Sequence, residues 1–318
     1  MVRSARMMLV VMLAATIAAC SSQGNSVAPT VPQQSAVEQP QSIARSTTPS
    51  TFLFGEPVDI ARARLAQQGL ALPSGAPNSK DFQPMNLTDP IVPEETQNPN
   101  AVAGPPVYIC DINSRLWKIT TGTNTIKFIG KEGVQLTDLG IDPVNHVLYG
   151  VSYSALYRVS ETTGRATFIA RLGISTANAL VFAKNGLGFT AGNNDYGLYD
   201  LTASGRFGYV GSMYPFTSSG DLTFYDGYLV LSGQVGASNS SEPDDLVLLD
   251  PANGAPLEAV NTGLRILFGL YSPGKNELYG FANTSLYHFT SRVLLVKNFR
   301  SAGVGEIYGA AYDGYFQN

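Results

Sequence analysis

The stretch "TDLGIDPVNHVLYGVSYSALYRVSETTGRATFIARLG", from Thr137 to Gly173, decides the fold. It contains four short runs in which apolar and aromatic residues alternate with polar ones: "DLGID", "VLYGVSY", "ALYRVSE" and "ATFIARL". Runs of this kind, rich in Val, Leu, Tyr and Phe and bounded by turn-forming residues, are typical of β-strands. The stretch therefore predicts a small antiparallel unit of four strands.

The same unit recurs along the chain. Further copies begin near Ala177, Gly220 and Leu267, and the copy at Gly220 is lengthened by the insertion "QVGASNSSEP". Four strands at a period of about 40 residues is the pattern of a β-propeller blade. In three copies the turn between the third and fourth strands ends in a glycine, which accepts the positive φ that such turns require. These glycines are Gly164, Gly205 and Gly254.

The two ends of this region complete a fifth blade. The C-terminal "EIYGAAYD" matches a first strand, whereas "VYICDIN", "RLWKITTG" and "TIKFIGKEG" match strands two, three and four. Pairing the two ends closes the ring and leaves no open inner edge. The sequence therefore predicts an all-β, five-bladed β-propeller over residues 107–318, closed by N- and C-terminal strands in one blade.

The repeat itself resembles a known group. The pattern "GIDPxxxxLYGVxxxxLYRVxxxTGxxTFI" resembles the blades of exported bacterial propellers, in which segments such as "LYxIDxxTGxxTxIG" recur. The resemblance covers nearly all of residues 107–318 and implies the propeller fold. It implies no particular function, because propellers of this type serve many roles.

The N-terminus resembles that of a bacterial lipoprotein. Arg3 and Arg6 precede an apolar run of about a dozen residues, which is long enough for a signal peptide and shorter than the ~20 residues that span a bilayer. The run ends in Ile17-Ala18-Ala19-Cys20, which resembles the lipobox. The resemblance implies that residues 1–19 are a lipoprotein signal peptide, that acyl chains such as palmitate are attached to Cys20, and that the protein is held at a membrane of the cell envelope. Ser21 after the cysteine implies the outer membrane if the source is a diderm bacterium.

Residues 20–106 are rich in Pro, Gln, Ser and Thr and contain few bulky apolar residues. Such a segment buries too little apolar surface to offset the entropy lost on ordering, so we expect a flexible, disordered tether. Within it, "EPVDIARARLAQQGLAL" places apolar residues at helical spacing and predicts a short helix over residues 56–70. We interpret it as a transient helix in a disordered arm; docking on the domain or on a partner is the alternative.

The first strand of each blade is expected to line the central channel. Aligning the copies brings Asp138, Asn178, Asp221, Phe268 and Tyr308 to one equivalent position at the channel mouth. Three interpretations are open for the polar members. They form a cation or polar-ligand site; or Asp138 and Asp221 serve a glycosidase, as inner-strand carboxylates do in five-bladed glycosidases; or the acids bind backbone amides and hold the blades in register.

Other features favour a protein without catalytic chemistry. The chain has only two histidines, His146 and His288, with no cysteine nearby, so we expect no zinc site and no other metal or cofactor. Cys110 lies in the apolar run "VYIC" and is expected to be a small buried apolar residue. The net charge of −4 is spread along the chain and argues against a nucleic-acid partner.

The leading hypothesis is a membrane-anchored, non-catalytic propeller lipoprotein that acts as a binding or scaffolding module in the cell envelope. The lipid on Cys20 would attach it to the membrane, and its partner would be an envelope protein or a glycan. A carbohydrate-binding, lectin-like propeller and a glycoside hydrolase that uses Asp138 and Asp221 are the alternatives. The insertion, with Glu242, Asp244 and Asp245 at its end, is expected to be a solvated acidic loop, with a partner epitope as the alternative.

Overall fold

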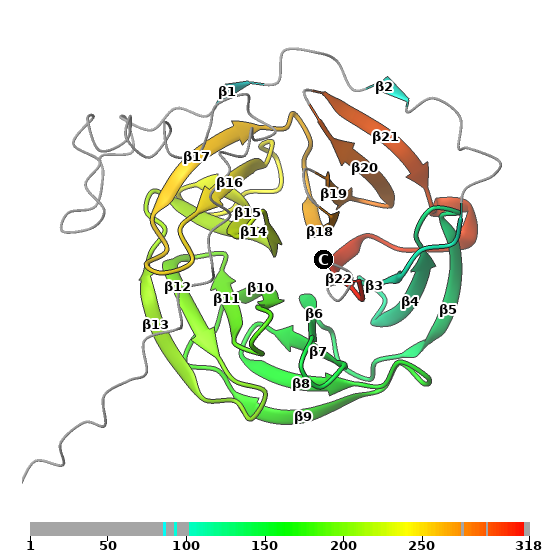
Figure 1. Cartoon of the computed structure of the whole chain (residues 1–318), viewed down its shortest axis with the longest axis horizontal. Coiled ribbons are helices and arrows are strands. Elements are labelled where there is room, and N and C mark those ends of the chain that lie inside the picture. Colours follow the sequence, from blue (N-terminus) through cyan, green and yellow to red (C-terminus); the bar gives the residue numbers. More distant parts are fainter. Residues whose placement is uncertain (1–84, 87–91, 94–101, 275–276, 291, 315–318) are drawn as a thin grey trace, which may run out of the picture. The chain divides into compact units, whose positions relative to one another are not determined.

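The structure is a computed structural model, and it describes residues 85–86, 92–93, 102–274, 277–290 and 292–314. The described part from residue 102 onward is an all-β ring of five antiparallel sheets, as predicted (Figure 1). Each sheet is one blade, with its first strand at the centre of the ring and its fourth at the periphery. Within the described ranges, no helix has the length and apolar character needed to cross a bilayer.

Four blades follow the chain in order. Blade 1 contains β6 (Asp138–Asp142), β7 (Val147–Ser152), β8 (Ala155–Val159) and β9 (Ala166–Arg171). Blade 2 contains β10 (Ala177–Phe182), β11 (Gly188–Gly192), β12 (Asp195–Leu201) and β13 (Phe207–Ser212). Blade 3 contains β14 (Phe216–Tyr225), β15 (Tyr228–Val235), β16 (Asp245–Leu249) and β17 (Pro256–Asn261). Blade 4 contains β18 (Leu267–Gly274), β19 (Glu277–Ala282), β20 (Ser285–Phe289) and β21 (Val293–Asn298).

Blade 5 joins the two ends of the propeller. Its inner strand is β22 (Ile307–Tyr312), which follows the 3₁₀ turn η1 (Arg300–Ala302), and its other strands are β3 (Pro106–Asp111), β4 (Arg115–Thr120) and β5 (Thr125–Lys131). β22 and β3 pair antiparallel from Ile307 opposite Asp111 to Tyr312 opposite Val107. The predicted closure of the ring is therefore confirmed.

The burial of each strand follows its place in the blade. Every residue of β10 and β14 is buried, whereas β9 is half-buried or exposed throughout. Neighbouring blades pack face to face: Leu180 and Phe182 of β10 lie in one cluster with Tyr149 and Val151 of β7. Burial of one such large apolar side chain contributes ~1.5–3 kcal/mol, so the faces between blades are the main source of stability.

The glycine turns are also as predicted. Gly164, Gly205 and Gly254 all have a positive φ, between 73° and 88°. The turn of one blade touches the outer strand of the blade before it: a Cβ added to Gly130 of β5 would lie 1.9 Å from the carbonyl oxygen of Thr163. Small residues on both sides therefore allow the close approach of neighbouring blades.

Two short strands come from the segment for which the sequence predicts only a tether. β1 (Met85–Asn86) pairs parallel with Val260 and Asn261 of β17, and β2 (Val92–Pro93) pairs parallel with Leu294 and Leu295 of β21 (Figure 1). The outer edges of blades 3 and 4 are thus extended by the chain's own N-terminal segment. The signal peptide, Cys20 and the helix predicted over residues 56–70 lie outside the described residues.

Candidate functional site

The predicted channel residues do not all occupy equivalent positions on the inner strands, because most of these strands carry a β-bulge. The register between first and second strands shifts at Asn178 in β10, at Phe268 in β18 and at Tyr308 in β22, whereas β6 is regular. An extra residue at a bulge moves all later residues by one place. The single equivalent position that the sequence alignment predicts is therefore wrong for these three residues. Ala179, Gly269 and Gly309 take the place that Asp138 and Asp221 hold in blades 1 and 3.

Asp138 and Asp221 together bind one backbone amide from each of the five inner strands. Asp138 Oδ1 accepts the N–H groups of Leu139 at 2.7 Å and Ala310 at 3.2 Å, and its Oδ2 accepts that of Leu180 at 2.5 Å. Asp221 Oδ1 accepts the N–H of Leu222, and its Oδ2 that of Leu270, both at 2.5 Å. The two carboxyl groups therefore connect all five blades at the centre of the ring.

The two acids also hydrogen-bond to each other, and both are fully buried, with 0% exposure. Burial raises the pKa of both carboxyl groups well above their usual range. The charge of Asp221 raises the pKa of Asp138 further, whereas the hydrogen bond with Asp138 favours the ionised form of Asp221. One proton is therefore held between the two carboxyl groups.

This geometry does not fit a glycosidase pair. The two carboxyl groups of a retaining glycosidase lie ~5–5.5 Å apart, and those of an inverting enzyme lie farther apart. Asp138 and Asp221 are in direct hydrogen-bond contact, and their oxygens are already occupied by backbone donors. They match instead the structural interpretation, in which buried acids hold the blades in register.

Beyond the acid pair, the inner strands surround a small cavity. It has a volume of about 30 Å³ and is lined by residues that follow the amide ring on each inner strand, including Gly140, Val181, Thr223, Ser272 and Tyr312. A water needs ~10–15 Å³ of such space, so the cavity has room for about two waters and none for a sugar ring. On this side of the acid pair, the inner strands therefore form a packed structural element.

The bulged residues lie on the other side of the acid pair. The Asn178 amide donates to the carbonyl oxygen of Ser218 at 3.3 Å. The Asn178 Oδ1 and the Ser218 hydroxyl are buried and have no hydrogen-bond partner among the protein groups. Phe268 and Tyr308 lie edge to face, with ring centroids 5.9 Å apart. Burial, followed by the charge of Glu306, raises the pKa of Tyr308. Of the four predicted binding residues, Asn178 and Tyr308 thus lie at the bulges, and Asp138 and Asp221 lie in the core.

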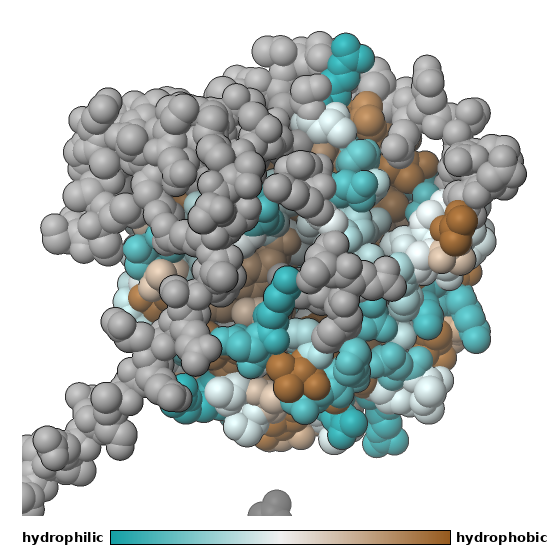
Figure 2. All heavy atoms as spheres, in the orientation of Figure 1, coloured by the Kyte–Doolittle hydropathy of each residue, from teal (hydrophilic) through white to brown (hydrophobic). Residues whose placement is uncertain are grey.

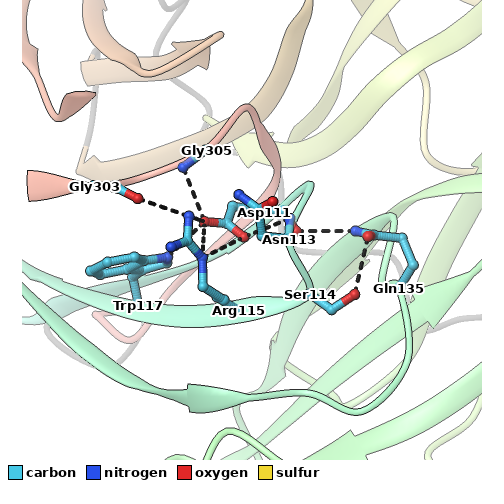
Figure 3. Close-up of polar contacts among 8 residues, drawn as sticks. All are labelled: Asp111, Asn113, Ser114, Arg115, Trp117, Gln135, Gly303 and Gly305. Atoms are coloured by element: carbon cyan, nitrogen blue, oxygen red, sulfur yellow. Dashed lines mark hydrogen bonds and ion pairs between the residues drawn. The ribbon is translucent and has the colours of Figure 1, made fainter.

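A second polar cluster, which was not predicted from the sequence, connects the N- and C-terminal parts of blade 5 (Figure 3). Asp111, at the end of β3, is fully buried and forms an ion pair with Arg115, with Nη2 and Oδ2 at 2.7 Å. Its Oδ2 also accepts the Trp117 indole N–H at 2.9 Å and the Gly305 backbone N–H at 3.1 Å. Arg115 reaches on to the carbonyl oxygen of Gly303 at 2.8 Å. The cluster ties the segment that leads into β22 to the hairpin of β3 and β4.

Two acids of the insertion are buried, which corrects the expected solvated acidic loop. Asp244 Oδ2 accepts the Leu267 N–H of blade 4 at 2.7 Å, and Asp245 Oδ1 accepts the Asn261 amide at 2.8 Å. The Gln234 side-chain amide makes several hydrogen bonds within the loop, including one that it donates to Asp244 Oδ1 at 2.8 Å. Burial raises the pKa of both acids to about 6. Only Glu242 of the three is exposed.

The other residues considered in the sequence, Cys110, His146 and His288, lie in strands or turns of the blades. Cys110 is fully buried in β3, and burial raises the pKa of its thiol, so it is a small core residue as predicted. His146 lies in a turn with a φ of 51°, and His288 stacks on Tyr279 with ring centroids 4.3 Å apart. In the described part of the chain, no group of three or more His, Cys, Asp or Glu residues is placed to hold a metal ion.

No family model and no curated protein matches the chain. A chain in the crystal structure of a nidogen/laminin complex is similar over 66% of this chain and 98% of its own length, at 13% identity and a TM-score of 0.42. A symmetrical protein from a study of de novo evolutionary emergence covers 65% of this chain at 18% identity and a TM-score of 0.40, over 93% of its own length. A structural genomics protein of unknown function from Bacteroides thetaiotaomicron covers 62% at 14% identity and a TM-score of 0.40, over 59% of its own length.

Proposed function

We propose that this protein is a membrane-anchored, non-catalytic propeller lipoprotein that acts as a binding or scaffolding module in the cell envelope. The observation that carries the proposal is the filled centre of the ring. The acids that a propeller enzyme would use are hydrogen-bonded to each other and to the five inner strands, and the channel beyond them leaves only about 30 Å³. A ring of this kind offers its outer surface, rather than its channel, for interaction.

The proposal gives each part of the chain a role. The lipid on Cys20 attaches the protein to the membrane, because several acyl chains, at ~0.8 kcal/mol per buried methylene, anchor a protein without a membrane span. Residues 20–84 hold the propeller away from the bilayer. The propeller presents a rigid surface to an envelope protein or glycan, because its blades are fixed to one another by buried hydrogen bonds.

The anchoring is tested by metabolic labelling with a fatty acid that carries an alkyne group. The wild-type chain is expected to be labelled and to sediment with membranes, whereas Cys20→Ala is expected to be unlabelled. Cys110→Ala serves as the matched control, because it removes the other cysteine of the chain and is expected to leave labelling unchanged. Labelling that persists in Cys20→Ala would contradict the proposed anchor.

The binding role is tested by chemical crosslinking in intact cells, followed by purification of the full chain and mass spectrometry. A specific envelope protein, enriched over a lipidated control protein of similar size, is the expected result. Failure to enrich any envelope component would remove the support for a scaffolding role. A glycan array probed with the same full chain decides the carbohydrate-binding alternative, which predicts a saturable signal on specific saccharides.

A further inference from the structure

The outer strands of the five blades differ in what covers their edges. β17 and β21 each pair with an added strand from the N-terminal segment, whereas β5, β9 and β13 are the last strands of their sheets. Among the described residues no further strand pairs with β5, β9 or β13, and blades 5, 1 and 2, which carry these three free edges, follow one another around the ring (Figure 1). An uncovered edge exposes backbone N–H and C=O groups that can pair with another strand.

The three free edges also share an exposed aromatic residue at one equivalent position. Phe128 pairs across from Trp117, Phe168 from Tyr157 and Tyr209 from Tyr199, each beside a shift in register. Their exposed fractions are 45%, 56% and 65%. In each case the ring meets its cross-strand partner edge to face, with centroids 5.1 to 5.9 Å apart.

The equivalent place in blade 4 shows what these edges accept. Leu295 of β21 lies across from Tyr287 beside the same kind of register shift, and it is there that Val92 and Pro93 of β2 pair in parallel with Leu294 and Leu295. In blade 4, therefore, a leucine occupies the position at which the added strand pairs. The three free edges have an exposed aromatic ring at the equivalent position. The turn glycine of the next blade lies against the later part of the outer strand, such as Gly130 in β5.

The charge of the free edges indicates the chemistry of the partner. β5 and β9 contribute Lys127, Lys131 and Arg171, all exposed, and the three strands contain no acidic residue. The sequence around β1 and β2, "DFQPMNLTDPIVPEETQN" over residues 81–98, has four acidic residues and no lysine or arginine. In Figure 2, which looks down the ring, hydrophobic and hydrophilic groups are interspersed on the coloured part of the visible face.

We propose that β5, β9 and β13 are docking edges for an extended acidic polypeptide segment of a partner protein, which adds as a parallel strand beside Phe128, Phe168 and Tyr209. The backbone pairing of the edge supplies the attachment, and an apolar side chain of the added strand packs on each ring. The lysines and arginine select acidic segments. This inference names the binding surface of the module described above and therefore rests on that proposed function.

The test uses the full chain and a synthetic peptide of residues 81–98 as a stand-in for the partner segment. We expect saturable binding, and on binding a slower hydrogen exchange of amides in β5, β9 and β13. We expect Phe128→Glu/Phe168→Glu/Tyr209→Glu to weaken binding at least tenfold. The control is Tyr153→Glu, because Tyr153 is 50% exposed and lies in the turn between β7 and β8, away from the outer edges. We expect it to bind within twofold of the wild type.

Several results would overturn the inference. They are no peptide binding, protection confined to β17 and β21, or equal binding by the triple variant after circular dichroism has confirmed its fold. Saccharide binding to the three rings with no protection of edge amides would assign them to a glycan instead. If the triple variant still captured the envelope partner found by crosslinking, the edge inference would be wrong while the scaffolding role would stand.

Discussion

Asp138 and Asp221 meet at the centre of the ring, and between them they accept a backbone N–H from every inner strand of the propeller. Five amide dipoles directed at one site would favour a bound anion, and here the anion is part of the chain. One proton is held between the two acids, so the site keeps a single negative charge instead of two. This contact explains how the five blades keep one register.

Replacement of either acid by its amide removes an acceptor from the ring of backbone N–H groups. Asp138 accepts three of these N–H groups and Asp221 accepts two. An unsatisfied buried polar group costs ~1–3 kcal/mol, so we expect Asp138→Asn and Asp221→Asn each to lower the free energy of unfolding by about that amount. Urea titration of both variants measures the change, and unchanged stability in both would contradict the structural role of the acids. Glu242→Gln, at an exposed carboxylate, is the control and is expected to change the stability by less than ~0.5 kcal/mol.

The buried acid Glu132 predicts that stability falls as pH rises. Burial, and then the charge of Asp111, raises the pKa of Glu132 to about 9 in the folded chain. A carboxyl group with a raised pKa stabilises the fold fully below its unfolded pKa of ~4.3, and this contribution is lost as the pH rises toward 9. Glu132→Gln should therefore stabilise the domain at pH 8 relative to wild type, with little difference at pH 4. Denaturant titrations of both proteins at the two pH values measure it; an equal effect at both would contradict the assignment.

Gly309 predicts a sharp steric effect at the centre. A Cβ at this position would lie 2.2 Å from the Asp138 Oδ1 and 2.4 Å from its Cα. We expect Gly309→Ala to displace Asp138 from the amide of Ala310 and to cost ~1–3 kcal/mol. Gly274→Ala is the matched control, because a Cβ there meets nothing within 4 Å. Thermal melting of both variants measures the difference, and a similar melting temperature for the two would show that the centre is not tightly packed.

The closing blade predicts a global effect of a local deletion. Removal of residues 306–318 takes away β22 and leaves β3 with a free inner edge. We expect the whole propeller to unfold at a much lower temperature, because every blade depends on the ring. Asp111→Ala is expected to act in the same direction and more weakly, by ~1–3 kcal/mol, since it leaves the Trp117 indole N–H and the Gly305 N–H without their acceptor. A melting temperature unchanged by the deletion would contradict the closure.

Much of this fold follows from the sequence, for identifiable reasons. The blade period, the turn glycines such as Gly164, and the pairing of the C-terminal strand all depend on patterns that repeat along the chain. The bulges at Asn178, Phe268 and Tyr308 could not be predicted in this way, because a bulge inserts one residue without changing the apolar character of the strand. A sequence alignment that omits the bulges therefore puts the buried acids Asp138 and Asp221 at the same position as residues of the channel mouth.

The added strands β1 and β2 were also beyond the reach of sequence reasoning. Each has two residues, which is too short for an alternating pattern, and each depends on an edge supplied by a distant part of the chain. The burial of Asp244 and Asp245 has the same cause, since their partners Leu267 and Asn261 lie in later strands. From the sequence alone, acids in a polar insertion are expected to be solvated, because the donors that bind them in the fold are distant in the chain.

The central claim is that the centre of the ring is structural and that binding takes place elsewhere on the surface. The most direct measurement is in-cell crosslinking of Asp138→Asn beside the wild-type chain, at a temperature at which circular dichroism shows both to be folded. The account predicts that the variant melts at a lower temperature and captures the same envelope partner with the same yield. Loss of capture by a fully folded Asp138→Asn protein would contradict it, because the acid pair would then belong to the binding site.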